Sequence, residues 1–369
     1  MGVARTIGRA TGRALDLLGP GYAKAGQILS TRKDILPAEI CAGVADAVVR
    51  AGDGCGSVAR VTREVRPGTG TPYARKTLRP GVRSSLERNL RTLRRGARLV
   101  ARVPAARGIP VVEMTEDVSM SVASQTDLLR ERESLHRLRS MVDAERVRVP
   151  EPLDDASSAD NLAMEWLEAD PRTALAVLDE RDREETMTVL VQALLRMIFV
   201  HGFFHCDLHP GNWWPTAPGR IAIVDAGFMY ELTPTDRWHF IEFFYGMAFG
   251  DGEHAFEHMV ATAHPDMLPA PDRMAAFRED VVRLVEAQHD APVDTFDLAT
   301  FGAELFQVQR RHRFRGDTAF IFPLIALLSI EGQLKEFSPR LDFQEIARRE
   351  LGRPLLDLRA RFALADLRR

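Results

Sequence analysis

The sequence predicts an α+β protein with two lobes, a small mixed lobe of strands and helices and a large helical lobe, preceded by a helical segment. The chain has 369 residues, more than one hydrophobic core usually holds. Short β-branched runs gather between residues 54 and 82, whereas helical spacing dominates from about residue 234 onward. We therefore expect a helical extension over 1–52, a small lobe over 53–168 and a helical lobe over 169–369.

Each element is expected from its local pattern. Apolar residues recur at helical spacing in the N-terminal segment, and the turn formers "RPGTGTP" separate two β-branched runs. The expected elements are, in chain order, helix over 1–52, a strand hairpin within 54–82, helix over 83–102, strand over 109–114, helix over 124–142, strand over 161–167, helix over 184–201, a loop over 203–212 and a buried strand within 220–228.

Composition and charge exclude several classes of protein. Hydrophobic residues make up 45% and charged residues 27% of the chain, which is typical of a folded globular protein. The net charge of −3 gives no general attraction to nucleic acid, so no nucleic-acid partner is expected. The arginine-rich stretch 75–107 is either a solvated helix face or a surface for an acidic partner or anionic lipid.

The location of the protein is expected from its cysteines and apolar segments. Three widely spaced cysteines favour a reducing cytoplasm. The most apolar stretch, "TAFIFPLIALLSI" at 318–330, is shorter than the roughly 20 residues that span a bilayer, so we expect a buried helix there. The expected location is cytoplasmic, with peripheral membrane association as an open alternative.

The stretch "HGFFHCDLHPGN" at 201–212 and the strand "IAIV" after it predict phosphoryl-transfer chemistry. Asp207 is followed by Asn212 at the spacing of the kinase pattern H-R-D-x-x-x-x-N, with His205 at the histidine position. Asp225 follows the strand. The first Asp of such a set orients the attacking oxygen, while the Asn and the second Asp hold Mg²⁺.

The cation that grips phosphate groups in kinases lies on a strand of the small lobe. Lys76 occupies this place in "TPYARKTLRPG", on the strand that follows the hairpin. The Glu that pairs with such a lysine lies on the next long helix, where "DLLRERESL" offers Glu131 and Glu133. Spacing alone leaves both glutamates open as the partner.

A metal site is the competing interpretation of the histidines in this stretch. His201, His205 and His209 have the spacing of a zinc-binding helix. Pro210 and Gly211 interrupt such a helix directly after His209, which favours the catalytic-loop interpretation.

With these residues in place, the chain resembles the UbiB/ADCK family of atypical, protein-kinase-like ATPases. The resemblance covers roughly residues 15–230. It rests on "GYAKAGQILSTRKDILPAEI" at 21–40, which looks like the K-x-G-Q signature of that family, on "GFFHCDLHPGN", on "LRPGV" after the lysine, and on the hinge-like strand "LAMEWLEA".

The resemblance implies a bilobal protein-kinase-like fold with an N-terminal helical K-x-G-Q extension across the active site. It also implies binding of ATP or ADP with Mg²⁺ or Mn²⁺, and a link to isoprenoid-quinone or other lipid metabolism at membranes. Asp207, Lys76 and Glu131 would be catalytic, and Asn212 and Asp225 would hold metal. The residues that would contact the nucleotide are Lys76, Gly54, Gly56, Ser57, Glu165, Lys24 and Gln27.

The sequence departs from the pattern of this family at several positions. The phosphate loop carries Gly54, Cys55 and Gly56 in place of an alanine-rich run, which leaves the preference between ATP and ADP open. Gln125 replaces an acid before the pairing Glu, and Ala226 replaces the aromatic residue of D-F-G. Many members also end in transmembrane helices, and no comparable segment is found in this sequence.

Two other functions remain open at the level of sequence. A small-molecule phosphotransferase of the aminoglycoside or choline-kinase type shares the Asp-x-x-x-x-Asn spacing but has no K-x-G-Q extension. A non-catalytic nucleotide-binding scaffold is the second alternative. The phosphate acceptor could be a protein, a lipid or isoprenoid compound, a small molecule or water.

Overall fold

The structure is a computed structural model that divides into two compact units, each described here by itself. The first unit comprises Met1–Ser134 and Glu151–Trp166, and the second comprises Leu135–Pro150 and Leu167–Arg369. The extension expected over 1–52 lies outside the described residues except at three positions. The strand expected over 109–114 lies wholly outside them. Both therefore stay predictions, and the division of the chain into three parts stays a prediction as well. The structure describes residues 9, 42–43, 59–100, 116, 119, 126–170, 174–263, 268–289, 297–314 and 316–366.

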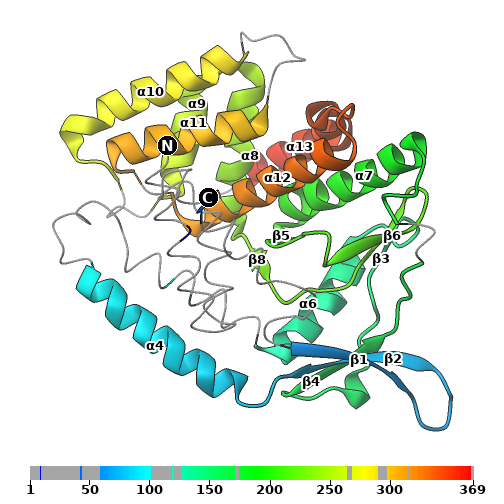
Figure 1. The fold of residues 1–369 in the computed structure, drawn as a ribbon. Coiled ribbons are helices and arrows are strands. Elements are labelled where there is room, and N and C mark those ends of the chain that lie inside the picture. Colours follow the sequence, from blue (N-terminus) through cyan, green and yellow to red (C-terminus); the bar gives the residue numbers. More distant parts are fainter. Residues whose placement is uncertain are drawn as a thin grey trace. The chain divides into compact units, whose positions relative to one another are not determined.

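The first unit contains an antiparallel sheet in the order β1-β2-β4 (Figure 1). The strands are β1 (Ala59–Val65), β2 (Pro72–Leu78) and β4 (Asn161–Glu165). The hairpin between β1 and β2 needs backbone with positive φ, which Gly68 and Gly70 supply at 89° and 70°. The predicted hairpin and the predicted strand over 161–167 are therefore confirmed.

Two of the helices that the structure describes lie wholly or partly in the same unit as this sheet. Helix α4 (Val82–Val100) has a buried apolar side and an exposed side of arginines; the buried residues are Leu86, Leu90 and Ala97, and the exposed ones include Arg88, Arg91 and Arg95. Helix α6 (Leu128–Met141) begins after Asp127, whose Oδ1 accepts a hydrogen bond from the Arg130 amide at 3.0 Å. Within α4, the arginine-rich stretch thus forms an exposed helix face, and whether an acidic partner or anionic lipid binds there stays a prediction.

The second unit contains two small sheets. In the first, β3 (Val147–Arg148) pairs parallel with β7 (Arg220–Ile223), and β7 pairs antiparallel with β6 (Trp213–Ala217). In the second, β5 (Phe203–His205) pairs antiparallel with β8 (Met229–Glu231). The expected loop over 203–212 is wrong for its first three residues, because buried aromatic side chains and pairing with β8 hold them in a strand.

Helices make up the rest of the second unit, and polar residues cap many of them. Asp179 caps α7 and Thr233 caps α8, each accepting a hydrogen bond from the amide three residues later. Helix α7 widens at its end into a π-helical turn, η5 (Arg196–His201), which stops at Gly202 with φ of 66°. The helices are α7 (Glu180–Leu195), α8 (Pro234–Phe249), α9 (Gly252–Ala261), α10 (Pro271–His289), α11 (Leu298–His312), α12 (Thr318–Phe337) and α13 (Phe343–Asp366).

Helix α12 is a core helix of this unit, packed against α7, α8 and α11. Phe320 lies in an aromatic cluster, with ring centroids 4.8 Å from Phe243 and 5.7 Å from Phe240. Its 20 residues exceed the thirteen expected from the apolar stretch, because the helix continues through the polar turn after Ile330. It is long and apolar enough to cross a membrane, but 67% of its most apolar window is buried within the protein, as in a core helix.

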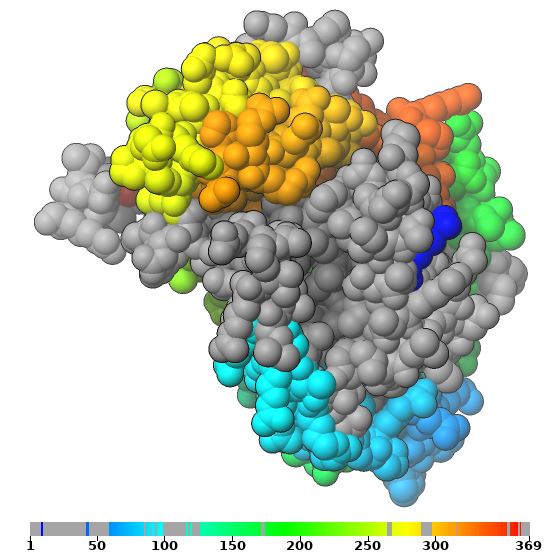
Figure 2. All heavy atoms as spheres, turned by 60° about the vertical axis from the view of Figure 1, so that its left-hand side comes forward, coloured from blue at the N-terminus to red at the C-terminus, as the bar shows by residue number. Residues whose placement is uncertain are grey.

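Helices α10 and α11 lie side by side on the surface of the same unit (Figure 2). Asp280 of α10 joins them, because its Oδ2 lies 2.8 Å from His312 Nε2 and 3.0 Å from Arg311 Nη1. Hydrogen bonds from His312 and Arg311 hold the pKa of Asp280 below its usual value.

The start of α11 depends on a carboxylate from α12. Glu331, which is 4% exposed, accepts hydrogen bonds from the amides of Leu298 at 3.0 Å and Ala299 at 2.8 Å. Those two amides belong to the first turn of α11, where no intrahelical partner exists. A buried side chain of α12 therefore caps α11, the helix before it in the chain.

We predict that Glu331→Ala lowers the free energy of unfolding by about 1–3 kcal/mol, since it leaves two amides without their acceptor. Urea denaturation at pH 7.5 measures this change. Glu336→Ala, at an exposed position of the same helix, is the matched control and should stay within about 0.5 kcal/mol of the wild type. Equal effects of the two substitutions would contradict the capping role.

Candidate active site

In the first unit, a strand and a helix bring together the lysine and the glutamate expected to pair. Lys76 lies in the middle of β2, opposite Val61 of β1 and Leu162 of β4. Its Nζ lies 2.6 Å from Oε1 of Glu131, in the first turn of α6. The side chains are 13% and 1% exposed. Glu133 is exposed, so the structure joins Lys76 to Glu131.

In the second unit, the segment between β5 and β6 folds back on itself around Asp207. The carbonyl oxygen of Asp207 accepts hydrogen bonds from the His209 amide at 2.9 Å and from Asn212 Nδ2 at 2.8 Å. The Asn212 amide donates to the His209 carbonyl at 2.8 Å. Because Nδ2 of Asn212 is engaged in this turn, its Oδ1 is the atom left for a ligand.

His205 joins this loop to the residue that follows β7. Its imidazole is fully buried. Nδ1 accepts a hydrogen bond from the Asp207 amide at 3.0 Å, and Nε2–H donates to the Asp225 carbonyl at 3.1 Å. This pair of bonds defines one neutral tautomer, and burial lowers the pKa of His205, which keeps the ring neutral. His205 is therefore a positioning residue for two of the three acidic and amide candidates.

Asp225 lies two residues after β7, whose last three residues are buried. Its Oδ1 accepts a hydrogen bond from the Gly227 amide at 2.9 Å, and the Val224 amide donates to the Asn212 carbonyl at 2.9 Å. Asn212 and Asp225 thus stand at the ends of adjacent backbone segments, beside the β6–β7 pair. Ala226, at the aromatic position of D-F-G, is buried, where its small side chain fills little space.

The alternative of a metal site built from His201, His205 and His209 finds no support in the described part of the chain. His205 uses both ring nitrogens in hydrogen bonds, and His209 Nδ1 accepts from the Gly211 amide at 2.9 Å. Burial, and then Asp207, raises the pKa of the neighbouring Cys206 well above its usual value, so this group is a thiol. These residues shape the loop instead.

Sequence reasoning missed a residue that holds the loop from a distance. Gln333 of α12 donates from Nε2 to the Leu208 carbonyl at 2.8 Å and accepts at Oε1 from the Trp213 indole at 3.0 Å. All three residues are buried. A single Gln in an apolar helix was the only available signal, and nothing in its local pattern names a partner 125 positions earlier.

Besides Lys76, Glu165 is the expected nucleotide contact that lies among the described residues. Glu165 ends β4, half-buried and opposite Tyr73, with its amide donating to the Glu151 carbonyl at 2.8 Å. The other expected positions lie outside the described residues: Lys24, Gln27, Gly54, Gly56 and Ser57. The departures at Cys55 and Gln125 also lie there.

The fold just described, a small sheet with a paired helix and a second, helical unit, belongs to the protein-kinase-like class. The model of the ABC1 atypical kinase-like domain matches residues 52–259, and the chain belongs to this family. The resemblance to UbiB-type atypical kinases and the predicted bilobal fold are therefore confirmed.

Individual relatives agree with this placement. The chain is 27% identical to a protein named "Probable protein kinase UbiB" from Xylella fastidiosa strain 9a5c, over 98% of this chain and 71% of the relative. It is 26% identical to a protein of the same name from Aeromonas hydrophila, over 91% and 68%. Among solved structures, Rv3197 of Mycobacterium tuberculosis in complex with erythromycin has a TM-score of 0.57 at 17% identity, covering 81% of this chain and 76% of that one, and thus shares the fold.

The Lys76–Glu131 pair yields a prediction about stability. Lys76→Met removes the ammonium group 2.6 Å from the buried Glu131 carboxylate, and breaking a buried ion pair in this way typically costs about 3–5 kcal/mol. The double substitution Lys76→Met with Glu131→Met removes both charges and should recover a large part of that loss. Chemical denaturation of the wild type, both single variants and the double variant gives the coupling energy.

Arg60→Met, at an exposed position of β1, is the control for loss of a positive charge from the same sheet. It should leave the free energy of unfolding within about 0.5 kcal/mol of the wild type. If the two single changes and the double change are additive, the ion pair contributes nothing to the stability of this unit.

Proposed function

We propose that the protein binds ATP or ADP with Mg²⁺ or Mn²⁺ and acts as a kinase-like ATPase or phosphotransferase. The observation that carries this proposal is the pair of hydrogen bonds at His205, which accepts from the Asp207 amide and donates to the Asp225 carbonyl. Together with the hydrogen bond from Asn212 Nδ2 to the Asp207 carbonyl, this link supports a fixed arrangement of an acid and two proposed oxygen ligands, as transfer of a phosphoryl group requires. Membership of a kinase-like family supports the same chemistry.

The residues present fit a magnesium ion. Asn212 and Asp225 offer an amide and a carboxylate oxygen, the donors that Mg²⁺ prefers, and the amide nitrogen of Asn212 is already engaged with the Asp207 carbonyl at 2.8 Å. When bound, the ion neutralises negative charge on the phosphate oxygens. We propose that Asn212 and Asp225 hold this ion.

The other residues would act on the acceptor and on the phosphates. We assign to Asp207 the orientation of the attacking oxygen and the late acceptance of its proton. We assign to Lys76 the contact with the α and β phosphates, since its ammonium group is anchored 2.6 Å from Glu131. Lys24, Gln27, Gly54, Gly56, Ser57 and Glu165 remain proposed nucleotide contacts that rest on the family resemblance alone.

The acceptor and the pathway are proposed from the relatives. The name UbiB and the family resemblance favour a role in isoprenoid-quinone or other lipid metabolism, and the name "Probable protein kinase" favours a phosphotransferase. A lipid or isoprenoid ligand and a cytoplasmic or peripheral-membrane location follow from this role. Since Rv3197 was solved with erythromycin, a bulky apolar ligand belongs in any binding screen. A small-molecule phosphotransferase and a non-catalytic scaffold are the competing functions.

Metal-dependent nucleotide binding is tested first by thermal unfolding. Millimolar ATP or ADP with Mg²⁺ should raise the melting temperature, because a ligand that binds only the folded state stabilises it. Asp225→Asn should lose most of this shift. Asp357→Asn, at an exposed position of α13, should keep it. A melt that nucleotide and metal leave unchanged in the wild type would refute the proposed binding.

Turnover separates the catalytic proposal from the scaffold alternative. Asp207→Asn should bind nucleotide nearly as the wild type does and yet release phosphate about 10²–10⁴ times more slowly, which corresponds to about 3–5 kcal/mol of barrier. A phosphate-release assay, with and without a panel of isoprenoid and phenolic lipids, measures this rate. A wild type that binds nucleotide but shows no release with any member of the panel would favour the scaffold.

A further inference from the structure

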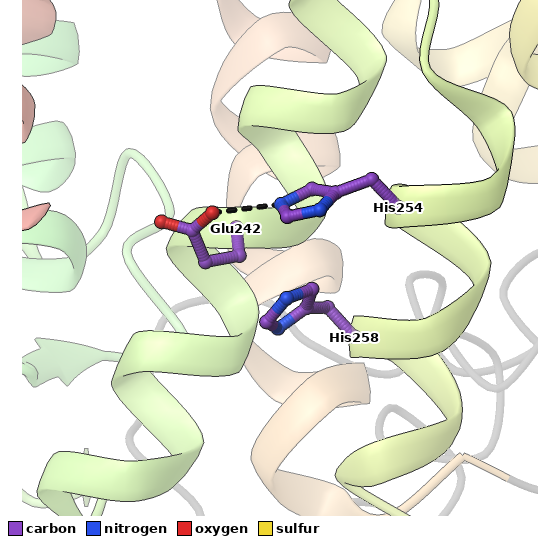
Figure 3. A group of neighbouring side chains, drawn as sticks. All are labelled: Glu242, His254 and His258. Atoms are coloured by element: carbon purple, nitrogen blue, oxygen red, sulfur yellow. Dashed lines mark hydrogen bonds and ion pairs between the residues drawn. The ribbon is translucent and has the colours of Figure 1, made fainter. Parts of the chain in front are cut away.

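A cluster of metal-ligating side chains lies in the second unit, on residues that the kinase-like chemistry does not use. Glu242 of α8 and His254 and His258 of α9 each offer a ligand atom, and these atoms lie within 4.8 Å of one another. Figure 3 shows both imidazoles projecting from one helix toward the carboxylate on the other. In the described part of the chain, this is the one group of three or more His, Cys, Asp or Glu residues that meets this geometry.

The sequence brings these side chains together through two helical spacings and one close approach. His254 and His258 are four residues apart on α9, so they share a face. His239 and Glu242 are three residues apart on α8 and share a face as well. The helices come close at Gly246, where an added Cβ would meet the Ala255 nitrogen at 2.7 Å. Glycine at this position thus permits the two faces to approach.

The carboxylate at the centre is buried and partly engaged. Glu242 is 1% exposed. Its Oε2 lies 2.7 Å from His254 Nε2, and Arg359 of α13 donates to Oε1 at 2.6 Å and to Oε2 at 3.0 Å. Arg359 therefore binds both carboxylate oxygens, and Oε2 also faces His254.

A third imidazole orients His258. The Nδ1 atoms of His239 and His258 lie 2.9 Å apart in a hydrogen bond. Since Nδ1 of His258 is engaged, Nε2 is its nitrogen that remains for a ligand. Histidines that bind metal commonly form such a second hydrogen bond, which fixes the tautomer and the ring.

Two imidazoles of the cluster are desolvated. Burial, and then the nearby His254 and His239, lowers the pKa of His258 to about 4. Burial also lowers the pKa of His239. The ion pair between Glu242 and Arg359 alone does not explain why three imidazoles lie beside it.

We propose that Glu242, His254 and His258 bind one Zn²⁺ ion that clamps α8 to α9, with His239 as the positioning residue for His258. Two imidazoles and one carboxylate are a ligand set that Zn²⁺ takes in proteins, with water in the fourth place. The proposal is independent of the proposed nucleotide chemistry. Mg²⁺ is a poor match, because it prefers oxygen ligands throughout.

Metal binding requires one distance between ligand atoms to increase, and it places a cation near the positive charge of Arg359. Two ligands at about 2.0–2.1 Å from a tetrahedral ion are about 3.3 Å apart, so the 2.7 Å separation of His254 Nε2 and Glu242 Oε2 must widen. The guanidinium of Arg359, which also lies over the Tyr245 ring at 3.3 Å from its centroid, repels a cation nearby. We therefore expect weaker binding than at a closed structural zinc site.

The experiment uses the full chain, freed of metal with a chelator and titrated with Zn²⁺ by calorimetry and with Co²⁺ by visible absorption. We expect one Zn²⁺ per chain, d–d absorption of a tetrahedral cobalt site, and a higher melting temperature with Zn²⁺. His254→Ala and His258→Ala should weaken binding at least tenfold, and His239→Ala by about tenfold, as loss of a side chain that hydrogen-bonds a metal ligand typically does. Mg²⁺ should not compete.

Controls separate this site from the nucleotide site and from misfolding. His136→Ala, at an exposed histidine of α6, and Asp225→Asn should both bind zinc as the wild type does. His254→Gln and His258→Gln retain a polar side chain and should also lose binding while their metal-free melting temperatures stay near that of the wild type. A wild type that takes up no zinc, or a His254/His258 double variant that binds as tightly as the wild type, overturns the proposal and leaves a buried ion-pair network.

Discussion

The candidate active site of the second unit depends on one buried imidazole. His205 accepts a hydrogen bond from the Asp207 amide through Nδ1 and donates to the Asp225 carbonyl through Nε2. On Asp207 and Asp225 these bonds use backbone groups only, so His205 engages neither carboxylate. A neutral ring with one donor and one acceptor is needed, which explains why burial that disfavours a charged imidazole suits this position.

Local patterns predicted the elements that are long or have a strong turn signal. The "RPGTGTP" hairpin, the buried strand before Asp225 and the helix that carries Glu131 all follow from spacing and composition. Short strands such as β3, β5 and β8 were missed, because two or three residues are too few for a period to show and each is held by a partner remote in the sequence. The length of α12 was missed because its last turns are polar.

The residues of the candidate site also divide into those that a local sequence pattern predicts and those that it does not. Spacing alone singled out Asp207, Asn212 and Asp225, since the kinase pattern is a short-range one, while their roles stay predictions. Gln333, the Glu331 cap and the His254–Glu242 contact join residues 12 to 125 positions apart. No local pattern carries such information, because tertiary packing selects the partner. In the sequence, the only sign of these contacts is a single polar residue within an apolar helix.

The hydrogen bonds of Gln333 bear on which part of the chain can stand alone. The match to the ABC1 domain ends at residue 259, but the Leu208 carbonyl and the Trp213 indole, both inside that match, find their partner on α12. A fragment cut at 259 would leave two buried polar groups unsatisfied and a face of α7 and α8 stripped of its packing. The boundary of sequence similarity is therefore not a boundary of autonomous folding, and truncation for expression should leave α12 in place.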